Sequence, residues 1–246
     1  KNEPALPEND ERYEHRHDWR KGKRGHTKIS AGPSDNSADA ILYGDQELVL
    51  DARTLNRMRG QLGATLVGTN VDRSDFFQSK IIRRKGIRIA VMGIVDPYAI
   101  KFYPDEIQNR IRLNDPVKSV KNEMKKLQNK ADIFVLLTHQ GYDLDVQFAK
   151  KVDGLDLIVG SHSQTAIEQP KEINNTLIVQ SGKAGYYVGL VKIKMKKGKI
   201  VEKSGRLDTM KFELPDDPRI IDMIEEYEKK SGRMNHRKKK LLGLDH

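Results

Sequence analysis

Residues 132–139 read DIFVLLTH, an apolar run that ends on a histidine. Two further strand-like runs have the same form: residues 38–45, ADAILYGD, end on an aspartate, and residues 155–162, LDLIVGSH, end on a histidine. In open α/β sheets the carboxyl ends of the strands border one crevice, so we expect the three terminal residues to converge there. Two imidazoles and a carboxylate so placed predict a divalent metal site. The predicted ligands are Asp45, His139 and His162.

The rest of the chain alternates strand and helix signals, which indicates an α/β fold. Asp115 suits an N-cap and Pro116 the first helical turn, so a helix is expected to begin there. We expect strands over residues 38–44, 64–69, 78–84, 87–95, 132–138, 155–160, 176–180 and 188–195. We expect helices over residues 52–62, 115–128, 143–151 and 217–230.

The chain divides by composition into three parts. Residues 1–37 are polar, contain several Pro and Gly, and lack apolar periodicity, which predicts an extended arm. Residues 38–230 are expected to form one α/β domain, and residues 231–246 a basic tail. The chain begins with Lys1 and shows no signal-peptide pattern, which favours a processed product or a fragment and allows an exported, periplasmic location.

The composition excludes cysteine-based sites and argues against nucleic-acid binding and a membrane span. The formal net charge is +10, but the basic residues are dispersed in short runs, which is typical of a solvated surface. The strand segments lack interleaved aromatic residues and the lone Trp19 lies in the arm, which argues against nucleic-acid binding. The absence of cysteine excludes thiolate ligands and disulfides. No apolar run reaches the roughly 18 residues of a membrane span.

The predicted ligand set suits zinc, manganese or iron. A lone histidine is more often an ordinary hydrogen-bonded residue than a ligand, but two that each follow an apolar strand favour a site. We therefore expect one divalent metal or none. His15, His17 and Asp18 offer further ligand atoms in the arm, but that segment lacks strand character, and we interpret them as exposed polar residues.

Three segments together resemble the second half of a calcineurin-like metallophosphoesterase, and within that superfamily the 5'-nucleotidase type. They are residues 138–143 (THQGYD), 154–165 (GLDLIVGSHSQT) and 178–189 (IVQSGKAGYYVG). Upstream, ADAILYGDQE at residues 38–47 resembles the segment that carries the family's Gly-Asn-His-Glu motif. The resemblance covers about residues 38–228 and implies an α/β sandwich of mixed β-sheets flanked by helices. It also implies hydrolysis of nucleotides and related phosphoesters by two metals, in proteins that are commonly exported.

The resemblance also assigns roles to single positions. His139 and His162 match the two histidines that the family uses on one metal, and Asp45 stands where the family has a metal-binding Asn. Gln46 occupies the place of the catalytic His, which protonates the leaving group or steadies the phosphate. Gln164 replaces the second His of the Gly-x-His-x-His motif, a ligand of the other metal. The family's opening strand with Asp-x-His, and the Gly-Asp that bridges the metals, have no clear equivalent before Ala38.

These departures leave two functions open. The first is a degenerate, non-catalytic domain that serves as a structural or interaction subunit of an exported complex, with another protein chain or a separate amino-terminal fragment as its partner. The second is a metal-dependent phosphoester hydrolase that missing amino-terminal strands or a partner chain complete. An amide cannot transfer protons as the histidine does, so Gln46 favours the first function for the isolated chain.

Overall fold

The computed structural model describes residues 38–211 and 213–232. These divide into two units, one that ends at Thr209 and one that begins at Met210, and each is described by itself. The expected arm with His15, His17 and Asp18, and nearly all of the expected basic tail, lie outside the described residues.

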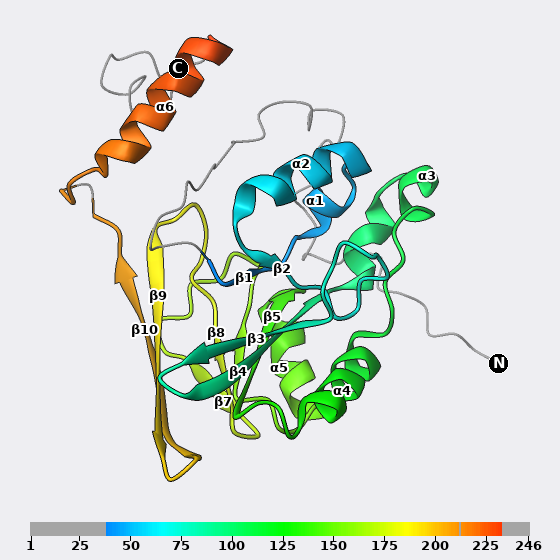
Figure 1. The fold of residues 1–246 in the computed structure, drawn as a ribbon, viewed down its shortest axis with the longest axis vertical. Coiled ribbons are helices and arrows are strands. Elements are labelled where there is room, and N and C mark those ends of the chain that lie inside the picture. Colours follow the sequence, from blue (N-terminus) through cyan, green and yellow to red (C-terminus); the bar gives the residue numbers. More distant parts are fainter. Residues whose placement is uncertain (1–37, 212, 233–246) are drawn as a thin grey trace. The chain divides into compact units, whose positions relative to one another are not determined.

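A six-stranded mixed sheet forms the centre of the first unit, in the order β3-β4-β5-β6-β8-β7. The four inner strands are parallel to one another, and the two edge strands run antiparallel to their neighbours (Figure 1). In sequence order the strands are β3 (Ser79–Arg84), β4 (Ile87–Val95), β5 (Ile133–His139), β6 (Leu157–Val159), β7 (Lys171–Ile173) and β8 (Thr176–Val179).

Two helices, α4 (Pro116–Leu127) and α5 (Tyr142–Lys151), cover one face of this sheet. The α4 helix begins as the sequence predicts, because Asp115 Oδ1 accepts a hydrogen bond from the Lys118 amide at 2.7 Å. Their apolar sides meet the sheet in a buried cluster. The cluster includes Met92, Ile94, Val120, Leu136, Phe148, Ile158 and Ile178.

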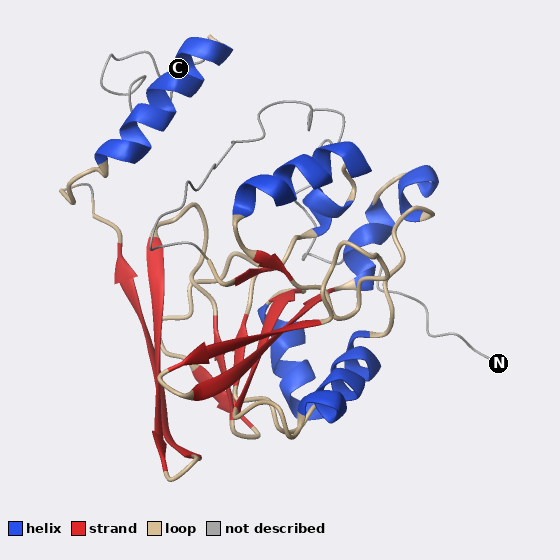
Figure 2. Cartoon of the chain, viewed as in Figure 1, coloured by secondary structure: helices blue, strands red, loops and turns tan. Residues whose placement is uncertain are grey.

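The opposite face packs against a second layer of strands (Figure 2). This layer contains the antiparallel pair β9 (Tyr187–Lys196) and β10 (Lys199–Thr209), and the short parallel pair β1 (Ala40–Ile41) and β2 (Thr65–Leu66). A second buried cluster joins Val91, Val135 and Leu177 of the central sheet to Val191 and Ile193 of β9. The predicted fold class, a sandwich of mixed β-sheets flanked by helices, is confirmed.

Four helical elements complete this unit. They are α1 (Asp45–Leu48), α2 (Ala52–Leu62), the 3-10 helix η3 (Pro97–Phe102), which follows β4, and α3 (Asp105–Gln108). Tyr43, Leu48 and Leu55 form a third buried cluster with Val95, the last residue of β4.

The second unit contains α6 (Pro218–Ser231), which Asp217 caps. Within the described ranges, no helix has the length and apolar character to cross a membrane.

The structure shortens some predicted strands and adds others. The run expected over residues 38–44 pairs only through β1, because the chain turns into α1, where Glu47 Oε2 accepts from the Gly44 amide at 3.0 Å. The run expected over residues 64–69 is likewise reduced to β2. The strands β7 and β10 and the short elements α1, η3 and α3 have no counterpart among the predicted elements.

Candidate metal centre

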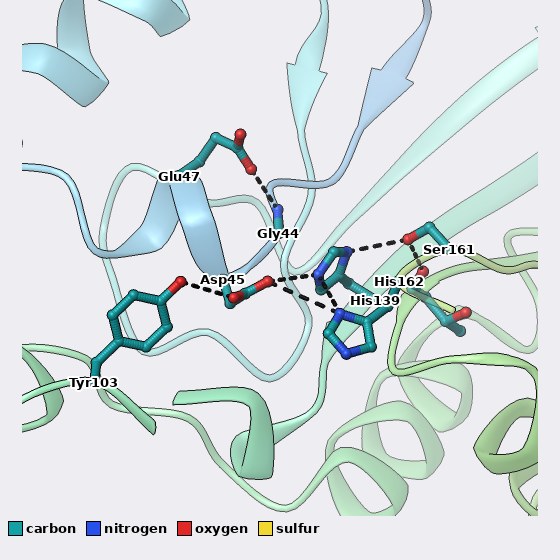
Figure 3. Close-up of polar contacts among 8 residues, drawn as sticks. Gly44, Asp45, Glu47, Tyr103, His139, Ser161 and His162 are labelled. Atoms are coloured by element: carbon teal, nitrogen blue, oxygen red, sulfur yellow. Dashed lines mark hydrogen bonds and ion pairs between the residues drawn. The ribbon is translucent and has the colours of Figure 1, made fainter. Parts of the chain in front are cut away.

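Three segments of the first unit bring the predicted ligands together. His139 is the last residue of β5, Asp45 is the first residue of α1, and His162 follows β6 after a short loop. Figure 3 shows the three side chains pointing toward one another. The sequence placed these residues at one edge of a sheet, and the structure brings them together there; whether they bind a metal stays a prediction.

The three ligand atoms lie within 4.0 Å of one another. His139 Nε2 lies 2.7 Å from Asp45 Oδ1 and 3.0 Å from His162 Nδ1. His162 Nδ1 lies 4.0 Å from Asp45 Oδ1. Metal–ligand bonds of about 2.1 Å place neighbouring ligand atoms roughly 3.0 to 3.4 Å apart, and the three separations bracket this range. A nitrogen, nitrogen and oxygen donor set of this kind fits a divalent transition metal.

The hydrogen bonds around His139 indicate which ring nitrogen is free. The Ser161 hydroxyl donates to the Thr138 carbonyl at 2.6 Å, so Ser161 Oγ accepts from His139 Nδ1 at 3.2 Å. This tautomer, inferred from the bonding pattern, leaves the Nε2 lone pair facing the carboxylate of Asp45. Two lone pairs at this distance repel, so the geometry requires a proton or a metal ion among the three ligand atoms.

The same bonds exclude a serine nucleophile at this place. Asp45, His139 and Ser161 lie in a line that resembles a catalytic triad (Figure 3). In a triad the base must accept the serine proton, whereas here the Thr138 carbonyl holds it. Ser161 therefore orients the imidazole of His139 toward the candidate metal centre.

Tyr103 supports Asp45 from the other side of the site. Its hydroxyl donates to Asp45 Oδ2 at 2.8 Å. Burial acts to raise the pKa of Asp45. A proton shared with His139, the bond from Tyr103 and the nearby imidazoles outweigh burial, so the pKa is lowered. Burial and the charge of Asp45 in turn raise the pKa of Tyr103. The Asp45 carboxylate is thus held ionised, with one oxygen directed at the histidines.

His162 lies in a loop whose backbone is constrained. His162 has φ 79° and Gln164 has φ 55°, both in the left-handed region that favours glycine. The Gln180 side chain is buried, and the donors around it fix the orientation of its amide group. In that orientation its oxygen accepts from the backbone amides of Gln164 at 3.0 Å and Thr165 at 3.1 Å. Burial and the neighbouring His139 lower the pKa of His162, which favours the neutral form that a metal ligand requires.

The two positions occupied by glutamine are exposed. Gln46 lies on α1 directly after Asp45, and Gln164 lies in the loop after His162. In the part of the chain that the structure describes, the only group of three side chains suited to a metal is the set of Asp45, His139 and His162. The sequence prediction did not include Tyr103, Ser161 and Gln180 because they act through other residues. Ser161 and Gln180 lie within segments that carry the family resemblance, whereas no motif surrounds Tyr103.

Comparisons with known proteins agree with this architecture. The chain is 33% identical over 110 residues to an uncharacterised metallophosphoesterase, YunD, of Bacillus subtilis (strain 168). It is 25% identical over 223 residues to an apyrase of Tabanus yao. A solved structure of a 5'-nucleotidase precursor from Thermus thermophilus superposes with a TM-score of 0.70 at 22% identity. No protein-family model matches the sequence.

Each match covers a larger share of this chain than of the related protein. They include 45% of this chain and 23% of YunD, and 78% of this chain and 39% of the apyrase. The superposition covers 78% of this chain and 43% of the 5'-nucleotidase precursor. The chain therefore spans less than half the length of each of these three proteins.

Proposed function

We propose that this chain, which belongs to the calcineurin-like metallophosphoesterase superfamily and within it to the 5'-nucleotidase type, binds one divalent metal ion and does not hydrolyse phosphoesters by itself. The convergence of Asp45, His139 and His162 is the observation that carries the proposal. These residues would hold the ion, whose chemistry in such sites is the polarisation of a phosphoryl oxygen or a bound water.

The described residues do not supply the second metal site and the proton donor of a two-metal centre. Two-metal phosphoesterases place both ions about 3.5 to 4 Å apart, each with its own ligands. Here Gln164 stands in place of a ligand of the second metal, and the Gln46 amide offers no proton to a leaving group. Glu47, the nearest further carboxylate in sequence, bonds to the Gly44 amide. One ion held without a proton donor supports a binding role over a catalytic one.

We further propose that the chain acts as a structural or interaction subunit in an exported or periplasmic complex. Its partner would be another protein chain or a separate amino-terminal fragment. Fractionation of the source cells and native mass measurement of the purified protein test this directly. A monomer without a co-purifying partner, recovered from the cytoplasm, would contradict it.

The metal proposal is tested by titrating the full chain with Mn²⁺ or Zn²⁺ in a calorimeter and by elemental analysis. We expect one ion for each chain, and loss of binding in His139→Gln and His162→Gln. Asp143→Asn is a matched control, because it changes an exposed carboxylate on α5 outside the site. Wild-type protein that binds no ion, or His139→Gln protein that binds it unchanged, would reject the site.

The second candidate is a metal-dependent phosphoester hydrolase that missing amino-terminal strands or a partner chain complete. The similarity to a metallophosphoesterase and to an apyrase favours it. AMP and p-nitrophenyl phosphate are suitable substrates for the metal-loaded protein, assayed alone and with any co-purifying chain. Hydrolysis by the chain alone that disappears in His139→Gln would overturn the non-catalytic proposal. Hydrolysis that needs the co-purifying chain and disappears in His139→Gln would favour the second candidate.

A further inference from the structure

Asp145 is a fully buried carboxyl group on α5 that is not among the predicted ligands. Its Oδ1 accepts a hydrogen bond from Gln140 Nε2 at 2.8 Å. Its Oδ2 is buried and has no hydrogen-bond partner among the described residues. A buried polar atom left in this state is unfavourable and calls for an explanation.

The carboxyl group lies where the two histidine-bearing strand ends meet. Gln140 directly follows His139, and a β-carbon added to Gly160 would lie 2.3 Å from Asp145 Oδ2. Gly160 in turn is two residues before His162. The Asp145 side chain therefore contacts Gln140 and Gly160, one close in sequence to each predicted histidine ligand.

The polar surroundings of this carboxyl group are only partly satisfied. The Thr138 hydroxyl, on the other side of His139, is also buried without a hydrogen-bond partner in the described part of the chain. Burial raises the pKa of Asp145 to about 6. The bond from the Gln140 amide acts in the opposite direction, and so does the nearby Thr138 hydroxyl, whose geometry falls short of a regular hydrogen bond. No cationic side chain is among the causes of this shift. An apolar side chain would pack here at lower cost, so packing alone does not account for the carboxyl group.

We propose that Asp145 is a positioning residue that holds the ends of β5 and β6 at the spacing that directs His139 and His162 at one point. It does so through its bond to Gln140 and its close contact with Gly160. The role deepens the proposed function and rests on it as far as metal affinity is concerned. The placement of the two rings is a separate property that is measured without metal.

The test compares Asp145→Ala and Asp145→Asn in the full chain, with Asp143→Ala as a matched control on the exposed side of α5. Ring signals of ¹⁵N-labelled histidine are assigned with His139→Gln and His162→Gln. We expect Asp145→Ala to shift or broaden the signals of both rings. Asp145→Asn keeps an acceptor for Gln140 and a second polar atom, so it should leave them in place, as should the control.

Mn²⁺ titration gives the second readout. Loss of a group that orients metal ligands typically weakens affinity by about 10- to 100-fold, and we expect this for Asp145→Ala but not for Asp145→Asn. A folded Asp145→Ala protein with wild-type ring signals would overturn the proposal, and so would equal shifts in both variants. If Asp145→Ala does not fold, Asp145→Ser is judged by the same criterion. Wild-type protein that binds no Mn²⁺ would reject the metal site and leave the ring signals to decide the positioning role.

Discussion

Replacing Gly44 with alanine is expected to displace the His139 imidazole and weaken metal binding. The Gly44 backbone lies directly against this ring: an alanine β-carbon would lie 2.6 Å from Cε1 and 2.9 Å from each ring nitrogen. The φ of Gly44 is −83°, which alanine adopts freely, so the substitution causes no backbone strain. Its effect is therefore a steric contact with one identified side chain.

The size of the effect follows from these distances. Ordinary contact begins near 3.4 Å, so the ring must retreat by roughly 1 Å. The 2.7 Å separation of His139 Nε2 and Asp45 Oδ1 would then exceed hydrogen-bond length. We expect about 10- to 100-fold weaker metal affinity, or about 1.4 to 2.8 kcal/mol, because a ligand is misplaced. Overpacking adds a loss of about 1 to 3 kcal/mol in the free energy of unfolding.

Calorimetric titration with Mn²⁺ and urea unfolding measure the two quantities. Gly60→Ala is the matched control, since a β-carbon there meets nothing within 4 Å on α2. It should raise the free energy of unfolding by about 0.5 to 1 kcal/mol through helix propensity and leave metal affinity unchanged. A folded Gly44→Ala protein with wild-type affinity would refute the assignment of His139 as a ligand placed by this contact.

Three further substitutions probe the surroundings of the site and the fold. Folding raises the pKa of the Asp145 carboxyl from 3.8 to about 6, so the wild type loses stability as the pH rises through these values. Asp145→Asn lacks this loss and should therefore stabilise the protein increasingly as the pH rises from 4 to 8. The gain reaches about 3 kcal/mol at most, and urea unfolding that shows a pH-independent difference would contradict it. Tyr103→Phe removes the donor to Asp45 Oδ2, so the pKa of Asp45, followed by carboxyl NMR, should rise; an unchanged value would count against the bond. Asp115→Ala removes the N-cap of α4 and should cost about 1 kcal/mol in urea unfolding, whereas a neutral result would contradict the cap.

The sequence predicts the central sheet well because its parallel strands are buried on both faces. Residues 89–95 and 133–137 carry no charged or polar side chain, and the structure places β4 and β5 on the predicted runs almost without change. The β10 strand was missed because charged residues interrupt its sequence, and its pairing with β9 depends on partners distant in the fold. The run at residues 38–44 was overextended, since its apolar pattern does not reveal the cap that starts α1.

The site was predictable where it follows strand ends and unpredictable where it depends on tertiary approach. Asp45, His139 and His162 converge as the strand-end argument expects. Tyr103 reaches Asp45 from 58 residues away along the chain, and no motif around it signals this. Asp145 is one acidic residue of an amphipathic helix in the sequence, and only the packing of α5 shows that it is buried.

The arrangement of the three ligand atoms leads to a last prediction, that metal and fold stability are coupled. Asp45 Oδ1 and His139 Nε2 lie 2.7 Å apart, so a proton or a cation must lie among the ligand atoms, and a metal ion can take the place of the proton. An ion that binds only the folded state stabilises it by about 2.7 kcal/mol at a concentration one hundred times its dissociation constant. Mn²⁺ should therefore raise the unfolding temperature of the wild type, a chelator should reverse the rise, and His162→Gln should abolish it. The abolition separates this site from the exposed carboxylates, because those remain in the variant. If the metal raises the unfolding temperature equally in both proteins, the ion binds elsewhere and the convergence of the three side chains is held by a shared proton alone.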